Sequence, residues 1–132
     1  MKRSWIKRIG KSERSKLIKS CDDIFRKILL LRDKCCQYSG RHENLQVSHY
    51  ITRENLHLRW NFDNCHIING GVHIFLFHKR PHVYKEWLIR KIGIEKVEWL
   101  EMQDKTNCQP LYTYDIKMKK LELSEELKLC KQ

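Results

Sequence analysis

Histidine is the residue type whose distribution first suggests chemistry in this sequence. All seven histidines lie between positions 42 and 82, at residues 42, 49, 57, 66, 73, 78 and 82. Imidazole binds metal ions and titrates near neutral pH, so such a cluster is typical of a metal site or of acid/base catalysis. Histidine is also common in basic surface loops, and clustering alone leaves both interpretations open.

The elements that would position these histidines follow from hydrophobic spacing. Residues 12–33 repeat apolar side chains at helical spacing, with Ser12 as the N-cap, which predicts a helix. Residues 45–50 alternate like a short strand, and residues 65–68 resemble a second one. Gly70 and Gly71 end this second strand, and the chain from residue 72 suits a helix as far as the break at residues 79–81.

The rest of the chain predicts further helices at residues 82–92, closed by Gly93, at residues 94–102 and at residues 115–129. This order predicts an α+β fold, in which a two-stranded antiparallel sheet and its helix are flanked by an N-terminal helix and by C-terminal helices. A length of 132 residues suits one domain. We divide it into a flexible basic arm at 1–11, the N-terminal helix at 12–33, a ββα core at 45–80 and a helical C-terminal part at 82–130.

Composition narrows the class of protein. Lysine and arginine number 27 against 16 acidic residues, a net charge of +11. Such an excess on a small domain favours a nucleic-acid partner, with a merely basic or ribosome-like protein as the alternative. The longest apolar run, residues 28–31, is far shorter than the roughly 20 residues of a membrane span. Without a secretory signal, we expect a soluble cytoplasmic protein with no membrane contact and with its six cysteines reduced.

Three of the polar residues occur at intervals that carry more information than the clustering. His49 is separated by fourteen residues from Asn64, and Asn64 by eight from His73. His49 ends the first predicted strand, Asn64 opens the second, and His73 opens the following helix. This order resembles the HNH, or ββα-metal, nuclease motif, with the intervals of the colicin-type DNases.

Flanking segments are similar to one family in particular, the NinG (Rap) recombination endonucleases of lambdoid phages. The run from Leu45 to Arg53, LQVSHYITR, resembles that family's segment around the first histidine. Further similarities are found in Leu58-Arg-Trp60 with Asn64-Cys-His66, in Asp23-Ile-Phe25 with Leu31-Arg-Asp33, and in residues 92–101. The resemblance covers roughly residues 17–129 and, if the chain is phage-encoded, implies the cytoplasm of a bacterial host.

The resemblance implies a role for each motif residue. His49 would be the general base that takes a proton from water, Asn64 would pin the loop after the first strand and orient His49, and His73 would bind one divalent ion. The ion would be Mg²⁺ or Mn²⁺, with Ni²⁺ and Co²⁺ as further candidates because imidazole donors favour later transition ions.

A second metal ligand must come from elsewhere in the sequence. Ser48 stands where many HNH enzymes have an acid or a histidine before His49. We choose His66, because it lies two residues after Asn64 and strand alternation would direct both side chains to one face; a structural hydrogen-bonding role is the alternative. His78 is a further candidate, although a phosphate contact or a surface position suits it better, because five positions from His73 is a poor spacing on an α-helix.

Family members usually also hold a structural zinc with two C-x-x-C pairs, and this sequence departs from that pattern. The first pair reads Cys36 to Ser39, and Asn69 and Val72 replace the second. One ligand of four remains, so we expect no structural zinc. Cys36 and Cys65 are then expected to be small core residues; a site improvised from Cys35, Cys65 or His42 is the alternative.

Basic residues near the motif are candidates for DNA contacts. Arg53 and Arg59 flank the predicted site and suit bidentate phosphate contacts. The positive surface would be extended by Lys79, Arg80, Lys85, Arg90 and Lys91, although each could equally belong to a plain solvated helix face. Trp60 and Trp87 are expected in the core rather than stacked on bases.

Two functions are consistent with these features of the sequence. The first is a metal-dependent endonuclease selective for branched DNA, such as Holliday junctions or D-loops, with the substrate taken from the family resemblance. Symmetric resolution of a junction takes two cuts, which suggests a homodimer. The second is a catalytically impaired, zinc-less DNA-binding or interaction protein derived from the HNH fold, which the lost cysteines favour.

Overall fold

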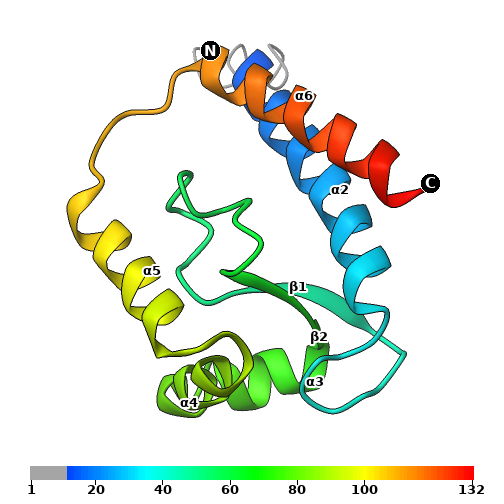
Figure 1. Ribbon diagram of the computed structural model, residues 1–132, viewed down its shortest axis with the longest axis vertical. Coiled ribbons are helices and arrows are strands. Elements are labelled where there is room, and N and C mark those ends of the chain that lie inside the picture. The colour runs from blue at the N-terminus through cyan, green and yellow to red at the C-terminus, as the bar shows by residue number, and fades with distance from the viewer. Residues whose placement is uncertain (1–11) are drawn as a thin grey trace, which may run out of the picture.

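Figure 1 shows a computed structural model of the chain, which describes residues 12–132. The elements run in the order α2 (Glu13–Asp33), β1 (Leu45–His49), β2 (Cys65–Asn69), α3 (Gly70–Val72), η1 (His73–Phe77), α4 (Pro81–Ile92), α5 (Ile94–Thr106) and α6 (Thr113–Cys130). The fold is α+β, with a two-stranded antiparallel sheet between an N-terminal helix and C-terminal helices, as predicted. The basic arm predicted at residues 1–11 lies outside the described residues.

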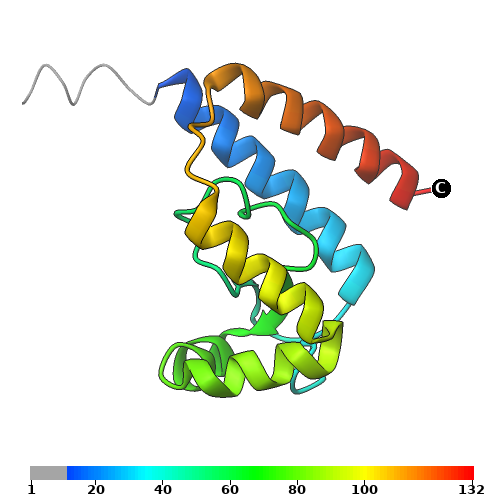
Figure 2. The ribbon, with the colours of Figure 1, turned by 60° about the vertical axis from the view of Figure 1, so that its left-hand side comes forward.

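Helix α2 begins where its capping residue predicts. The Ser12 side chain accepts a hydrogen bond from the Ser15 amide, which satisfies one of the first free N–H groups of the helix. The buried face of α2 consists of Cys21, Phe25, Ile28 and Leu29. This stripe contacts one face of the sheet and helix α6, which lies alongside α2 in both views (Figures 1 and 2).

The strand register sends neighbouring residues to opposite sides of the sheet. His49 pairs with Cys65, and Ser48 pairs with His66. Because side chains alternate along a strand, the Cys65 face joins the core against α2, while the His66 face is directed toward α4. A second core on that side contains Ile68 and the buried residues of η1, α4 and α5.

The junction between β2 and the following helix is tightly packed. Asn69 caps α3 by accepting a hydrogen bond from the Gly71 amide. A Cβ added to Gly70 would lie 2.4 Å from Nδ2 of Asn44, so only glycine fits there without rearrangement. The strand therefore ends at the glycine pair, as predicted.

The helix that follows departs from the expected geometry. We predicted a regular α-helix from residue 72, but one turn of α-helix is followed by a π-helical turn, His73–Phe77. The amide of His78 donates to the carbonyl of His73 at 3.1 Å, the five-residue spacing that defines this geometry. Pro81 then starts α4 at its first position, where its missing N–H leaves no internal bond unmade.

The predicted core assignments of four residues are confirmed. Trp60 and Cys65 are buried in the core next to α2, and Trp87 and Cys36 in the core next to α4. In residues 12–132, no helix has the length and apolar character needed to span a bilayer.

Candidate functional site

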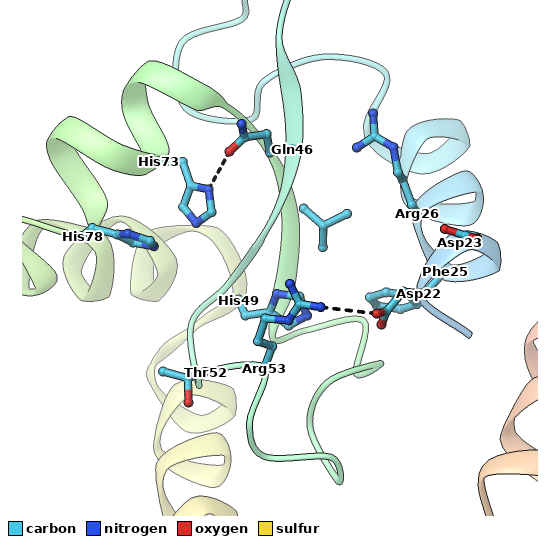
Figure 3. Close-up of a pocket in the computed structure, with 11 residues that line it drawn as sticks. Asp22, Asp23, Phe25, Arg26, Gln46, His49, Thr52, Arg53, His73 and His78 are labelled. Carbon is cyan, nitrogen blue, oxygen red and sulfur yellow. Dashed lines mark hydrogen bonds and ion pairs between the residues drawn. The ribbon is translucent and has the colours of Figure 1, made fainter. Parts of the chain in front are cut away.

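A pocket of about 550 Å³ lies where α2, β1 and η1 meet. Figure 3 shows acidic and basic side chains of α2 on one side and two histidines of the π-helical turn on the other. The pocket is lined by Asp22, Asp23, Phe25, Arg26, Gln46, Val47, His49, Thr52, Arg53, His73 and His78. It therefore brings together three of the histidines that the sequence analysis singled out.

His49 is held in one tautomer by the backbone. Its Nε2 lies 3.0 Å from the carbonyl oxygen of Arg59. Because a carbonyl oxygen can only accept, Nε2 carries the proton and Nδ1 keeps its lone pair. Burial lowers the pKa of His49, and the positive charges of Arg59 and Arg53 add to this effect. At neutral pH the ring is therefore uncharged and can accept a proton.

Asn64 ties together the loop that connects the two strands. Its buried side chain accepts from the amide of Ile51 at 2.7 Å and donates to the carbonyls of Ile51 and Leu58 at 3.0 Å each. The Tyr50 amide also donates to the Asn64 carbonyl, which closes the loop at its base. Asn64 thus fixes the loop backbone next to Arg59, whose carbonyl oxygen accepts the hydrogen bond from His49.

His73 and His78 form a pair because of the π-helical turn. Their ring centroids are 4.4 Å apart and the rings are nearly perpendicular. In an α-helix, residues five apart point about 140° away from each other, which is why the sequence favours a surface position for His78. His78 is indeed exposed, but the turn with five-residue hydrogen bonding brings its side chain to the same side as that of His73, which α-helical spacing does not predict. Burial lowers the pKa of His73, and so do its histidine neighbours.

His66 does not lie in this pocket. It sits on the opposite face of the sheet from His49, buried, with its ring edge-on to Trp87 at 5.4 Å between centroids. Its Nδ1 is buried without a hydrogen-bond partner among the described residues. His66 is therefore not brought to His73. Asn64 lies before β2, so strand alternation does not place it on the same face as His66, and within the strand it directs His66 toward α4. Burial, assisted by Arg32, lowers the pKa of His66 to about 4.

Arg59, which was predicted to contact phosphate, is bound to the carboxylate of Asp22 instead. Its guanidinium donates to Asp22 at 2.6 and 2.9 Å, and only 12% of the side chain is exposed. Asp22 also accepts from the Trp60 indole at 2.9 Å. Burial would raise the pKa of Asp22, yet the bonds from Arg59 and Trp60 lower it. Arg59 therefore anchors the connecting loop to α2.

The other predicted DNA-contacting residues differ in their availability. Lys85 forms an ion pair with Glu101, and the Lys91 amine donates to Gln37. Within the described part of the chain, the exposed cations of the set without such a side-chain partner on another helix or loop are Lys79, Arg80 and Arg90, while Arg53 and Lys91 are exposed and paired. Of these, Arg53 lines the pocket, where its 65% exposed side chain reaches Asp22 at 3.4 Å.

Asp22, Arg26 and Gln46 are among the pocket residues that sequence reasoning did not single out. Arg26 and Asp22 lie on α2, far from the histidines in sequence, and no local pattern connects them. Gln46 was part of a recognised run, but its type carried no chemical signal of its own. Its Oε1 lies 2.9 Å from Nδ1 of His73.

A comparison with protein-family models matches residues 2–132 to the family described as Bacteriophage Lambda NinG protein. The chain belongs to the NinG family. The match covers nearly the whole chain and confirms the family resemblance of the flanking segments. No curated protein and no solved structure was found to match. Membership of the NinG family associates the chain with bacteriophage recombination.

The positions at which the NinG resemblance implies zinc lie close together in the fold. Cys36 Sγ accepts a hydrogen bond from the Ser39 amide at 3.3 Å. Burial would raise the pKa of Cys36, but hydrogen bonds from Ser39 and from the Asn69 backbone lower it. Val72 packs on the same core cluster as Cys36. Hydrogen bonds and apolar contacts thus connect the segments that a zinc ion would otherwise link.

The donors available to a catalytic metal are few. Within residues 12–132, no group of three or more His, Cys, Asp and Glu side chains has an arrangement suited to a metal ion. The pocket offers the paired imidazoles of His73 and His78, while Asp22 is committed to Arg59 and Asp23 pairs with Lys19. Two imidazoles suit a divalent transition ion.

Proposed function

We propose that this NinG-family protein is a metal-dependent DNA endonuclease of the HNH, or ββα-metal, type, acting on branched recombination intermediates such as Holliday junctions or D-loops. One observation carries the proposal. His49 lines the same pocket as the His73–His78 pair, and Arg59 and Gln46 each leave one nitrogen of His49 and His73 free. A proton acceptor beside two metal-binding nitrogens is the combination that phosphodiester hydrolysis needs.

His49 acts as the general base. Its Nδ1 accepts a proton from a water directed at phosphorus, while Nε2–H remains bonded to the Arg59 carbonyl. Its lowered pKa keeps the ring uncharged near neutral pH, so the acceptor is available without prior deprotonation. Asn64 and the Asp22–Arg59 pair fix the loop that carries this carbonyl.

His73 and His78 would hold the divalent ion. This assignment replaces His66 with His78, because His66 lies on the other face of the sheet. When bound, the ion stabilises the departing 3′ oxygen and polarises the phosphate. With these two histidines as protein ligands, the substrate would complete the coordination of the ion.

Arg53 and Arg26 supply positive charge at the mouth of the pocket. Both line the pocket: Arg26 lies on α2, and Arg53 lies in the loop between β1 and β2. With Lys79 and Arg80 after the π-helical turn, they attract the DNA backbone rather than read bases. Selectivity for branched DNA would then come from shape, and two cuts per junction would suit a homodimer.

The second candidate is a DNA-binding protein of the same family without cleavage activity. The observation that favours it is the donor set, because no group of three or more metal-binding side chains is found among residues 12–132, and the pocket carboxylates of Asp22 and Asp23 pair with Arg59 and Lys19. The loss of the zinc cysteines at positions 39, 69 and 72 points the same way.

A cleavage assay separates the two candidates. Plasmid and four-way junction DNA are incubated with the wild type in Mg²⁺, in Mn²⁺ or in EDTA. His49→Ala is the test variant, and His42→Ala, an exposed histidine outside the pocket, is the matched control. We expect His49→Ala to abolish cleavage and leave DNA affinity nearly intact, because it removes a proton acceptor and no positive charge.

The control variant should cut like the wild type, and EDTA should stop both. Equal loss of binding and cutting in His49→Ala would refute the general-base role. Junction binding without cleavage in any of the metals would favour the second candidate.

A further inference from the structure

Gln46 contacts His73, one of the two histidines proposed to hold the metal ion. It is the second residue of β1 and pairs with Ile68, close to the point where β2 turns into α3. From there its Oε1 reaches Nδ1 of His73 at 2.9 Å, as the dashed line in Figure 3 shows. This contact links β1 directly to the π-helical turn across the pocket wall.

We propose that Gln46 is a positioning residue that holds His73 in the Nδ1–H tautomer, so that Nε2 is the nitrogen offered to a divalent ion. The inference deepens the proposed function and rests on it for the role of His73. An amide oxygen cannot donate, so the Nδ1 that faces it must carry the hydrogen. Neutral imidazole in water favours the other tautomer, with hydrogen on Nε2, which would block that nitrogen.

The surrounding backbone leaves room for this contact. A Cβ on Gly70 would lie 3.0 Å from Nε2 of Gln46, so the Gln46 amide occupies space that a larger residue would take. Gly70 itself is buried at the start of α3, three residues before His73. The glycine that ends the strand therefore also allows the amide to approach the histidine.

The two catalytic histidines then have opposite tautomers. The Arg59 carbonyl places hydrogen on Nε2 of His49, and Gln46 places it on Nδ1 of His73. Each acceptor leaves the nitrogen that the ring needs for its role, Nδ1 for the base and Nε2 for the ligand. Partners of this kind orient metal-bound histidines, and their loss typically weakens metal affinity about 10–100-fold.

Two substitutions at Gln46 test this role. Gln46→Met keeps a similar length without an acceptor, and Gln46→Glu keeps an oxygen acceptor. The tautomer of His73 is measured by long-range ¹H–¹⁵N correlation spectra of the metal-free protein at a pH where the ring is neutral. Mn²⁺ affinity is measured by titration calorimetry on the same samples, with His73→Ala as the reference for a lost ligand.

We expect wild type and Gln46→Glu to show the Nδ1–H form of His73. Gln46→Met should shift His73 toward the Nε2–H form and weaken Mn²⁺ binding about 10–100-fold. A wild-type spectrum with hydrogen on Nε2 would overturn the inference, and this holds even if Gln46→Met does not fold. Unchanged tautomer and affinity in a folded Gln46→Met would also overturn it.

The outcomes distinguish this inference from the proposed function. If His73→Ala leaves Mn²⁺ affinity unchanged, the metal role of His73 and the inference both fail. If Mn²⁺ binding and the tautomer behave as expected but no DNA is cut, the proposed nuclease activity fails and the role of Gln46 stands. Neither measurement depends on catalytic activity.

Discussion

The chemistry of the pocket depends on which nitrogen of each imidazole is free. His49 and His73 are both partly buried, and burial lowers the pKa of each, so both rings are uncharged near neutral pH. In a neutral imidazole one nitrogen carries hydrogen and the other has a free lone pair. The group that accepts from the first nitrogen therefore decides which nitrogen can accept a proton or bind a metal. The roles proposed for the two residues therefore rest on the Arg59 carbonyl and the Gln46 amide as much as on the histidines themselves.

The metal preference of cleavage is predicted at this scale. Imidazole donors favour later transition ions, whereas Mg²⁺ prefers oxygen ligands. Cleavage should therefore be supported better by Mn²⁺, Co²⁺ or Ni²⁺ than by equal Mg²⁺, as measured by initial rates. His73→Ala and His78→Ala should each weaken metal binding, and His66→Ala should leave it close to wild type. Highest activity in Mg²⁺ would require an oxygen ligand outside this assignment.

His66 should instead make stability depend on pH. Its pKa in the folded protein, about 4, lies below the ordinary 6.5, so the unfolded chain binds the proton first. The stabilising contribution is therefore complete above about pH 6.5 and is lost as pH falls toward 4. The shift is due to burial and to the positive charges of Arg32 and Lys91, opposed by Asp33 and Asp63.

The matching test is His66→Leu, which removes the titrating group. Between about pH 7.5 and pH 5, the wild type should lose about 2 kcal/mol more of its free energy of unfolding than His66→Leu does. Because Nδ1 of His66 has no hydrogen-bond partner among residues 12–132, the substitution should cost little at the higher pH. Urea denaturation at both pH values measures the difference, and parallel pH profiles would contradict the assignment.

At the scale of elements, two local features shape the site. The π-helical turn aligns His73 with His78, and the loop between the strands carries the acceptor of His49. That loop is attached to α2 through Asp22, which accepts from Arg59 and Trp60. The N-terminal helix therefore positions the proposed base, His49, although it contributes no histidine.

Two adjacent acids on α2 allow a matched test of this attachment. Asp22→Asn removes the charge that holds Arg59, and we expect the free energy of unfolding to fall by about 1–3 kcal/mol. Asp23→Asn is the control, since the Asp23 side chain is 59% exposed and forms an ion pair with Lys19, which is 65% exposed and lies one helical turn away. Its effect should stay within about 0.5 kcal/mol. Equal effects of the two substitutions, measured by urea denaturation, would argue against the anchor.

At the scale of the whole molecule, the sheet separates two hydrophobic cores. One lies between the sheet, α2 and α6, and the other between the sheet, α4 and α5 (Figure 2). Trp87 and Leu88 are buried in the second core, near the segment that carries Cys36. Apolar packing therefore holds both sides of the two strands and the helix after them, at the place where the family resemblance implies a structural zinc.

Chelation tests this replacement. We expect purified protein to contain no stoichiometric zinc and to remain folded in EDTA, because Ser39, Asn69 and Val72 offer hydrogen bonds and packing in place of thiolates. Elemental analysis and circular dichroism with and without EDTA measure both properties. One tightly bound zinc per chain, with unfolding on chelation, would refute the prediction.

Local patterns in the sequence were enough to predict the elements. Apolar spacing, the Ser12 cap, the glycine pair after β2 and Gly93 place the helices and strands within a few residues of their observed ends. The intervals among His49, Asn64 and His73 also identified residues that the fold gathers around one pocket and its loop. These features depend on residues that are close in sequence, because backbone geometry and capping act locally along the chain.

Only the tertiary structure decided which side chains meet. The strand register directs His66 away from the pocket, and the π-helical turn brings His78 into it. Asp22 binds Arg59, which the sequence had predicted to contact DNA. Each outcome depends on a contact between elements distant in sequence or on a helical geometry that apolar periodicity does not reveal. Packing selects among these contacts by burial and hydrogen-bond satisfaction, and neither quantity exists until the elements are assembled.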